Sequence, residues 1–304
     1  KRMSILKHLP QEKNLELNPE LDQALILKSF YDWCQNQNRE TLVMGILNVT
    51  PDSFSDGGLF YNTDEAVRHA LQLIEYGIDI IDIGGESTRP GAKKISEEEE
   101  IQRIIPVVKQ IRELSPEIII SIDTTKSMVA QKAIQSGANI INDISGFSFD
   151  NKMIDVVRES KVPVIIMHMQ GDPSNMQNKP VYDDLIIDIS SFFKSKIKLA
   201  TDAGIKKKQI ILDPGIGFGK TVGDNFQLIN QLNEFCKLGF PVMIGPSRKS
   251  FIGTTLNLPV DDRLEGTAAA VAVGVMNGAR IVRVHDVKEI KRVVTIVEKI
   301  RTAA

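Results

Sequence analysis

Side chains able to bind a small polar ligand gather at eight short stretches, each directly after an apolar run of the chain. The first, LNVTPDSFSDGG from Leu47 to Gly58, has twelve residues, whereas a tight turn needs about four. The opposite ends of the apolar runs carry mainly glycine and small residues, so we expect the chemistry on one side of the fold. The remaining stretches read GGESTRPGA, SIDTTK, NDISGF, HMQGDP, DPGIGFGKT, GPSRKS and RVHD.

Three of these residues form a candidate binding set for a planar amino-heterocycle. Asp123, Asn142 and Asp213 end neighbouring or near-neighbouring strands of the expected sheet, so we expect their side chains in one pocket. Carboxylates accept hydrogen bonds, and an amide both donates and accepts them. Taken singly, each residue has an ordinary alternative, because Asp123 would also cap a helix and Asn142 would also form a turn. His168 is explained equally well as a half-buried histidine.

Basic residues at the ends of the last two apolar runs indicate a phosphate or pyrophosphate site. Arg283 and His285 close the eighth run. GPSRKS closes the seventh and adds Arg248, Lys249 and Ser250 at an expected helix N-terminus, where free N–H groups favour anions. In (β/α)8 barrels the loops after strands seven and eight often bind phosphate. Solvated surface charge is the alternative, and it is the weaker one for bases that directly end buried strands.

The glycine-rich stretch DPGIGFGKT does not predict a nucleotide site. A phosphate-binding P-loop needs glycine where this chain has Pro214, and the dinucleotide fingerprint needs glycine where it has Lys220. The acidic run from Glu97 to Glu100 follows Ser96 and is typical of a charged helix N-terminus. Neither feature is assigned any chemistry.

Short β-branched runs alternate eight times with longer amphipathic segments after about residue 40. Such alternation predicts βαβ units and a parallel sheet. Eight units in about 260 residues match an α/β fold of the (β/α)8 TIM-barrel type, with a doubly wound open sheet as the alternative. The expected strands are 42–47, 78–83, 118–123, 138–144, 162–169, 209–213, 241–245 and 279–284, and the expected helices are 64–76, 96–114, 126–136, 151–159, 183–203, 225–237, 262–277 and 287–301.

Composition narrows the class of protein. The 304 residues are 42% hydrophobic and 25% charged with a net charge of −2, which is typical of a globular protein without an electrostatic footprint for nucleic acid or membranes. Two distant cysteines and the lack of a membrane span or signal pattern favour a reducing cytoplasm. Residues 1–40 are expected to be an extension or linker before a barrel at 41–304, packing as a helix through Leu21, Leu25, Leu27 and Trp33.

Taken together, these stretches resemble the dihydropteroate synthase family of folate biosynthesis. The match rests on NVTPDSFSDGG, GGESTRPGA, SIDT, INDISG, LDPGIGFGK, GPSRKSFIG and RVHDV, in the family's order over about residues 42–286. The resemblance implies a pterin-binding (β/α)8 barrel that condenses p-aminobenzoate with 6-hydroxymethyl-7,8-dihydropterin pyrophosphate. It also implies a Mg²⁺ requirement, a homodimer and a sulfonamide target. In some organisms the synthase is fused to the pyrophosphokinase that makes its substrate.

Residue roles follow from matching motifs to that family. The resemblance implies that Arg283 and His285 bind the pyrophosphate, and that Asn48 contacts both it and Mg²⁺. The expected pterin site consists of Asp123, Asn142, Met167, Asp213, Phe218 and Lys249, and the expected p-aminobenzoate pocket consists of Phe54, Thr88, Arg89, Pro90 and Ser250.

The implied chemistry agrees with the residue types. Pyrophosphate leaves once Mg²⁺ and the Arg283/His285 pair neutralise its growing charge, and Asp56 and Asp123 then stabilise a cation on the pterin methylene. Arg283, Asp123, Asp56 and Lys249 are therefore the expected catalytic residues. Two alternative interpretations remain. A pterin-binding methyltransferase would not need the pyrophosphate residues. A non-catalytic pterin-binding barrel would not need the two long loops, of which the first is NVTPDSFSDGG and the second GGESTRPGA.

Overall fold

Eight parallel strands form a closed barrel in this chain. The structure is a computed structural model that describes residues 19–36, 38–50, 59–88, 94–173, 176 and 180–303. The strands pair in the order β6-β5-β4-β3-β2-β1-β8-β7, and a parallel bridge joins Leu212 of β6 to Val242, the residue before β7. The doubly wound alternative is thereby excluded. The strands are β1 (Leu42–Asn48), β2 (Ile80–Gly84), β3 (Ile119–Asp123), β4 (Ile140–Asp143), β5 (Val164–Met167), β6 (Ile210–Asp213), β7 (Met243–Ile244) and β8 (Ile281–Val284).

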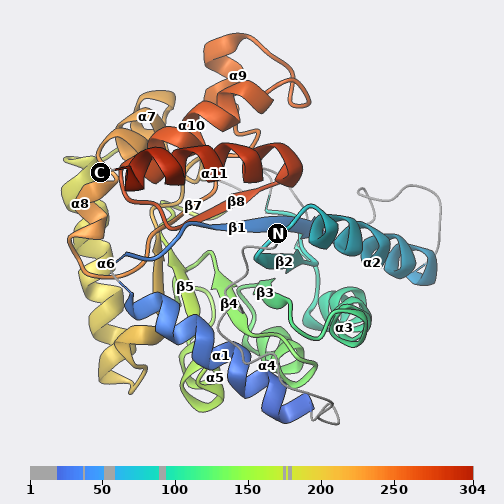
Figure 1. Ribbon diagram of the computed structural model, residues 1–304. Helices are drawn as coiled ribbons and strands as arrows, with labels where there is room; N and C mark the ends of the chain where they lie inside the picture. The colour runs from blue at the N-terminus through green and yellow to red at the C-terminus, as the bar shows by residue number, and fades with distance from the viewer. Residues whose placement is uncertain are drawn as a thin grey trace.

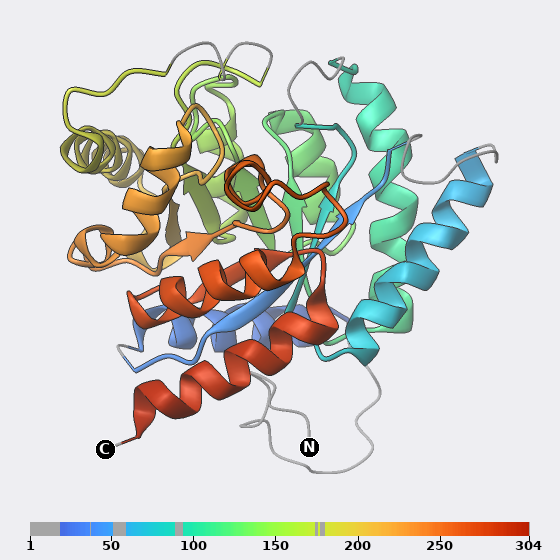
Figure 2. The same ribbon diagram turned by 90° about the horizontal axis from the view of Figure 1, so that it is seen from above.

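Helices surround the strands on the outside of the barrel (Figures 1 and 2). None of those in the described part of the chain is both long and apolar enough to cross a membrane. The helices are α1 (Pro19–Gln35), α2 (Leu59–Glu75), α3 (Glu97–Leu114), α4 (Ser127–Gln135), α5 (Met153–Ser160), α6 (Leu185–Asp202), η3 (Lys207–Gln209), α7 (Val222–Asn230), α8 (Asn233–Cys236), α9 (Ser250–Leu256), α10 (Leu264–Met276) and α11 (Val287–Thr302).

The single helix expected over residues 225–237 is two helices, so that prediction was wrong. The amide of Asn277 donates to the carbonyls of Ile229 and Asn230 at 2.8 and 3.1 Å. These are carbonyls at the end of α7, where a helix has no internal donors left. A residue far away in the sequence therefore caps the end of α7, and α8 begins at Asn233.

The barrel interior is apolar at the end where the strands begin. Alternate strand residues point inward, as the two-residue period of a strand requires. The inward residues of the first layer form one buried cluster with the buried side chains of α1. Its barrel members are Leu42, Met44, Ile80, Ile119, Ile140, Ile165, Ile211, Met243 and Ile281.

Helix α1 covers this end of the barrel (Figures 1 and 2). Its buried face consists of Ile26, Phe30, Trp33 and Cys34. The expected helix is present and Trp33 is buried as predicted, but Leu25 is 40% exposed and Leu27 is only half-buried. The side chain of Leu21 lies outside the described residues. The packing face is thus set by a different helical stripe from the one expected.

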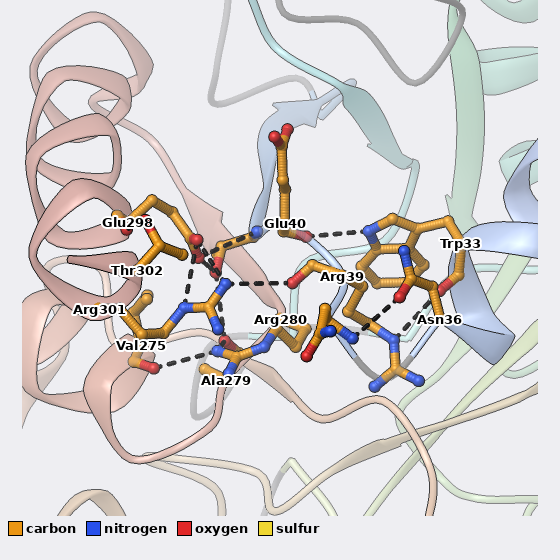
Figure 3. Close-up of polar contacts among 12 residues, drawn as sticks. Trp33, Asn36, Arg39, Glu40, Val275, Ala279, Arg280, Glu298, Arg301 and Thr302 are labelled. Atoms are coloured by element: carbon orange, nitrogen blue, oxygen red, sulfur yellow. Dashed lines mark hydrogen bonds and ion pairs between the residues drawn. The ribbon is translucent and has the colours of Figure 1, made fainter. Parts of the chain in front are cut away.

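Polar contacts tie the segment after α1 to the body of the barrel (Figure 3). The Trp33 indole donates to the Glu40 carbonyl at 2.9 Å. Arg39 donates to the carbonyls of Cys34 and Trp33 at 2.7 and 3.1 Å. Arg301 of α11 donates to the Arg39 carbonyl at 3.4 Å. The cover is therefore held by hydrogen bonds as well as by apolar packing.

Candidate functional site

The inward residues become polar toward the end where the strands finish. A small cavity lies there, and several of its lining residues come from the ends of strands. This is the end of a (β/α)8 barrel that carries active sites. The lining residues are Asp123, Asn142, Ile144, Met167, Asp213, Ile216, Phe218, Gly245, Lys249 and Arg283.

Arg283 on β8 lies between two buried carboxylates. Its Nε donates to Oδ2 of Asp82 at 2.6 Å, and its Nη2 donates to Oδ2 of Asp123 at 2.7 Å. Burial, together with the nearby charges of Asp82 and Glu100, raises the pKa of Asp123 to about 7, although Arg283 opposes this. Burial also disfavours the Arg283 charge, but the two carboxylates raise the pKa of Arg283 overall. The pair thus places a permanent cation beside a titratable acceptor.

Asp213 and Asn142 supply further hydrogen-bonding groups to the cavity. Oδ1 of Asp213 accepts the Gly215 N–H at 2.8 Å, which fixes the carboxylate at the start of the DPGIGFGK loop. Burial raises the pKa of Asp213 to about 6, against the opposing effects of that N–H group and Lys249. Nδ2 of Asn142 donates to Asp82 at 3.1 Å. The three residues predicted to share a pocket therefore do so.

Lys249 lies against the aromatic wall of the cavity. Its Nζ is 3.9 Å from the centroid of the Phe218 ring, within range of a cation–π interaction. Burial and the Arg283 charge lower the pKa of Lys249 to about 8, while Asp213 and Asp123 oppose the change. Gly217 allows this approach, since a Cβ there would lie 2.8 Å from Cδ of Lys249.

The other predicted phosphate residues are arranged less simply. Nδ1 of His285 lies 3.0 Å from Oγ of Ser247, and burial with the Arg283 and Arg248 charges lowers the pKa of His285 to about 4. Arg248 is paired with Asp286 at 2.6 Å. We therefore expect Arg248 to contribute less to an anion site than its position in the sequence predicts. Ser250 begins α9 as an exposed residue.

His168 and Lys220 form a buried pair behind this wall. Nζ of Lys220 donates to the Phe218 carbonyl at 2.8 Å and lies 3.1 Å from Nδ1 of His168. Burial and the Lys220 charge lower the pKa of His168 to about 3, so the ring is neutral near pH 7. His168 is thus a buried histidine that supports the Phe218 loop.

An ion cluster anchors the start of the second long loop. Lys126 pairs with Glu86 in that loop and with Glu100 of α3, the latter at 2.5 Å. Glu100 is buried, with 1% of its surface exposed. Glu100 belongs to the acidic run from Glu97, for which the sequence predicts no chemistry. Its ion pair with Lys126 is structural.

Three residues in or beneath the cavity were not predicted from the sequence. Asp82 is fully buried beneath the cavity, and Ile144 with Ile216 supplies apolar lining. The signal for Asp82 was present, because it follows Ile80 by two residues and so points into the barrel. Four predicted residues, Phe54, Asp56, Arg89 and Pro90, lie outside the described residues.

Two further predicted residues are half-buried. Asn48 ends β1, and Thr88 lies after β2. Asn48 is the candidate Mg²⁺ contact. Within the described ranges no cluster of three or more His, Cys, Asp or Glu side chains has the spacing of a metal site. Mg²⁺ commonly uses few protein ligands together with substrate phosphates, so one amide oxygen fits an ion that arrives with pyrophosphate.

Known proteins match most of the chain. The family model described as pterin binding enzyme matches residues 44–285. The dihydropteroate synthase of Bacillus subtilis is 51% identical over 254 residues, covering 83% of this chain and 86% of that protein.

Solved structures agree in fold and sequence. The dihydropteroate synthase of Yersinia pestis, in complex with a sulfonamide drug, gives a TM-score of 0.83 at 45% identity and covers 88% of this chain and 97% of its own. The dihydropteroate synthase of Xanthomonas albilineans, solved with 4-aminobenzoic acid, gives a TM-score of 0.82 at 40% identity. The match covers 88% of this chain and 95% of that chain. The chain belongs to the family of pterin binding enzymes, as one of its dihydropteroate synthases.

Proposed function

We propose that the mouth of this barrel joins p-aminobenzoate to 6-hydroxymethyl-7,8-dihydropterin pyrophosphate, releasing 7,8-dihydropteroate and pyrophosphate for folate biosynthesis. The observation that carries the proposal is the cavity in which Asp123, Asn142, Asp213, Lys249 and Arg283 converge. Two acceptors, an amide and two cations around an aromatic wall match a flat, nitrogen-rich ring with an anionic tail.

The pterin ring is proposed to bind deepest in the cavity. Asp123 and Asp213 accept hydrogen bonds from its ring N–H and amino groups, and the Asn142 amide completes the set. Lys249 donates from the Phe218 side. Met167, which also lines the cavity, supplies an apolar contact for one edge of the ring.

The pyrophosphate is proposed to bind at Arg283, His285 and Asn48. Arg283 supplies the permanent charge, because its pKa is raised by the neighbouring carboxylates. His285 is neutral near pH 7 in the free protein, since its pKa is lowered to about 4, so it contributes an N–H donor until an anion arrives. Mg²⁺, when bound beside Asn48, would neutralise charge on the departing pyrophosphate.

Departure of pyrophosphate leaves positive charge on the pterin methylene. Asp123 is proposed to stabilise it, with help from Asp56 in the first loop. The arylamine nitrogen then forms a C–N bond to the methylene and releases a proton to water. It is already a nucleophile, so the step needs no strongly activated nucleophile in the protein.

The p-aminobenzoate is proposed to bind between the two long loops and α9. Thr88 and Ser250 are proposed to line the edges of this pocket, and Phe54, Arg89 and Pro90 to complete it. The 4-aminobenzoic acid bound by the Xanthomonas albilineans enzyme supports this substrate, and sulfonamides are expected to compete for the same pocket.

The test is pyrophosphate release from the purified chain. Release should require the pterin substrate, p-aminobenzoate and Mg²⁺ together, and chelation of the metal should stop it reversibly. Arg283→Ala should weaken pyrophosphate binding most, while Leu25→Ala on the exposed side of α1 serves as a control with wild-type rates. Full release without p-aminobenzoate, or none under any condition, would refute the proposal.

A homodimer in the cytoplasm completes the proposal. The adjacent helices α10 and α11 expose apolar side chains, with Val273 and Met276 each about half exposed and Ile296 and Ile300 more so. Exposed apolar side chains of this kind favour a protein partner. Light scattering of the wild-type protein should give twice the mass of one chain. The Val273→Asp variant should give the mass of a single chain. Both cysteines are free thiols, as a reducing compartment would keep them.

A further inference from the structure

Asp82 lies beneath the cavity and touches two of its lining residues. Its side chain is fully buried on β2. One of its oxygens, Oδ2, accepts from Nε of Arg283 at 2.6 Å and from Nδ2 of Asn142 at 3.1 Å. Asp82 does not line the cavity itself. It can therefore act on a ligand only through its neighbours.

The contact with Asn142 determines which way that amide points. An asparagine side chain has nearly the same shape in both orientations, so packing alone selects poorly between its oxygen and its nitrogen. An ionised carboxylate only accepts hydrogen bonds. Because Asp82 is held by the Arg283 guanidinium, it presents an acceptor to Asn142. This acceptor requires Nδ2 of Asn142 to face Asp82.

The opposite atom of the amide, Oδ1, is thereby left to accept a hydrogen bond from a ligand. Oδ1 of Asn142 is buried and has no hydrogen-bond partner among the described residues, although Asn142 lines the cavity. A buried acceptor without a partner costs free energy, which a ligand N–H group would recover on binding. An amide turned the other way would offer N–H donors and would be mismatched to such a group.

We propose that Asp82 is a positioning residue that fixes Asn142 as a hydrogen-bond acceptor toward the pterin. The proposal rests on the function proposed above, because it takes the ligand of the cavity to be a pterin with ring N–H groups. Arg283 has a supporting part, in that its Nε holds the Asp82 carboxylate in place.

The experiment exchanges the two side chains. Asp82→Asn removes the obligatory acceptor, and Asn142→Asp places two carboxylates together. The double variant restores one donor facing one acceptor, with an acceptor still directed at the cavity and the net charge unchanged. The affinity for 7,8-dihydropteroate is measured by calorimetry, and the KM for p-aminobenzoate by turnover.

A matched control lies at the other end of the barrel. Asp79 is a buried aspartate just before β2 that accepts from the Val43 N–H at 2.8 Å and pairs with Lys291. Asp79→Asn neutralises a buried, cation-paired carboxylate far from the cavity. It should lower the unfolding temperature and leave the affinity for 7,8-dihydropteroate unchanged.

Each single exchange at Asp82 or Asn142 should weaken 7,8-dihydropteroate binding by about tenfold or more, as expected for a hydrogen bond to a charged group. The double variant should recover part of that loss, with the KM for p-aminobenzoate unchanged throughout. A double variant that folds but binds no better than Asn142→Asp would overturn the proposal, as would wild-type affinity in Asp82→Asn. If Asp82→Asn does not fold, the comparison of Asn142→Asp with the double variant decides.

The proposed function can fail separately. Wild-type protein that neither binds 7,8-dihydropteroate nor releases pyrophosphate would refute the function itself. Wild-type protein that does both, with no recovery in the folded double variant, would refute only the part assigned to Asp82.

Discussion

Arg283 donates to Asp123 at 2.7 Å across the inside of the barrel mouth. Even so, burial raises the pKa of Asp123 to about 7. Lowering the pH through 7 therefore protonates the free enzyme at this carboxylate and removes an acceptor for the pterin. We expect kcat/KM for the pterin substrate to fall about tenfold per pH unit on the acidic side. Asp123→Asn should react slowly and should lack this acidic fall in kcat/KM. An unchanged fall in that variant would mean that another group titrates.

The buried amine of Lys220 predicts a pH-dependent stability. Burial lowers the pKa of Lys220 to about 7, below the value of about 10.4 for an unfolded lysine. Between these values the unfolded chain binds a proton that the folded chain does not, so stability rises with pH. Relative to Lys220→Met, the wild-type free energy of unfolding should gain up to about 1.4 kcal/mol per pH unit. Denaturant titrations at pH 7, 8 and 9 measure this, and parallel curves would contradict it.

Much of the barrel is predictable because each strand is marked by a local sequence pattern. Runs such as Ile118–Asp123 are β-branched, apolar and bounded by turn residues, and one period of sequence is enough to recognise them. The end of α7 is different, because it depends on the Asn277 amide, 47 residues beyond Asn230. No local pattern contains such a contact.

The candidate site was predictable where polar residues end strands. Asp123, Asn142 and Asp213 stand out because they follow apolar runs directly. Asp82 stands inside such a run, and its importance depends on Arg283, which pairs with it from 201 residues away in sequence. The packing face of α1 was not predicted for a related reason. Phe30 packs against the first inward layer of the barrel strands, so the sequence of the helix alone does not define its buried face.

The cover formed by α1 should contribute to stability and not to catalysis. Phe30 is 1% exposed and belongs to the cluster that closes the lower end of the barrel. Phe30→Ala should lower the free energy of unfolding by about 3–5 kcal/mol, since it leaves a cavity in a buried layer. Leu25→Ala, at a 40% exposed position of the same helix, should change it by less than about 0.5 kcal/mol. Denaturant unfolding tests both, and a raised KM for either substrate in Phe30→Ala would contradict the separation.

Gly215 is the glycine on which the DPGIGFGK loop depends most directly. Its φ is 70°, and a Cβ there would lie 2.0 Å from the His168 carbonyl oxygen. Its N–H also holds Asp213 at 2.8 Å. Gly215→Ala should therefore displace both the loop and the carboxylate. We expect a stability loss of at least about 1–3 kcal/mol, together with a raised KM for the pterin substrate.

Gly223 provides the matched control for that substitution. It lies in the first turn of α7, and a Cβ there would find its nearest neighbour 3.8 Å away, at the Thr221 hydroxyl. Gly223→Ala should stabilise the protein by about 0.5–1 kcal/mol through helix propensity and leave the KM values unchanged. Thermal unfolding and steady-state kinetics on both variants test the pair. Equal effects at Gly215 and Gly223 would mean that the close approach to His168 does not constrain the loop.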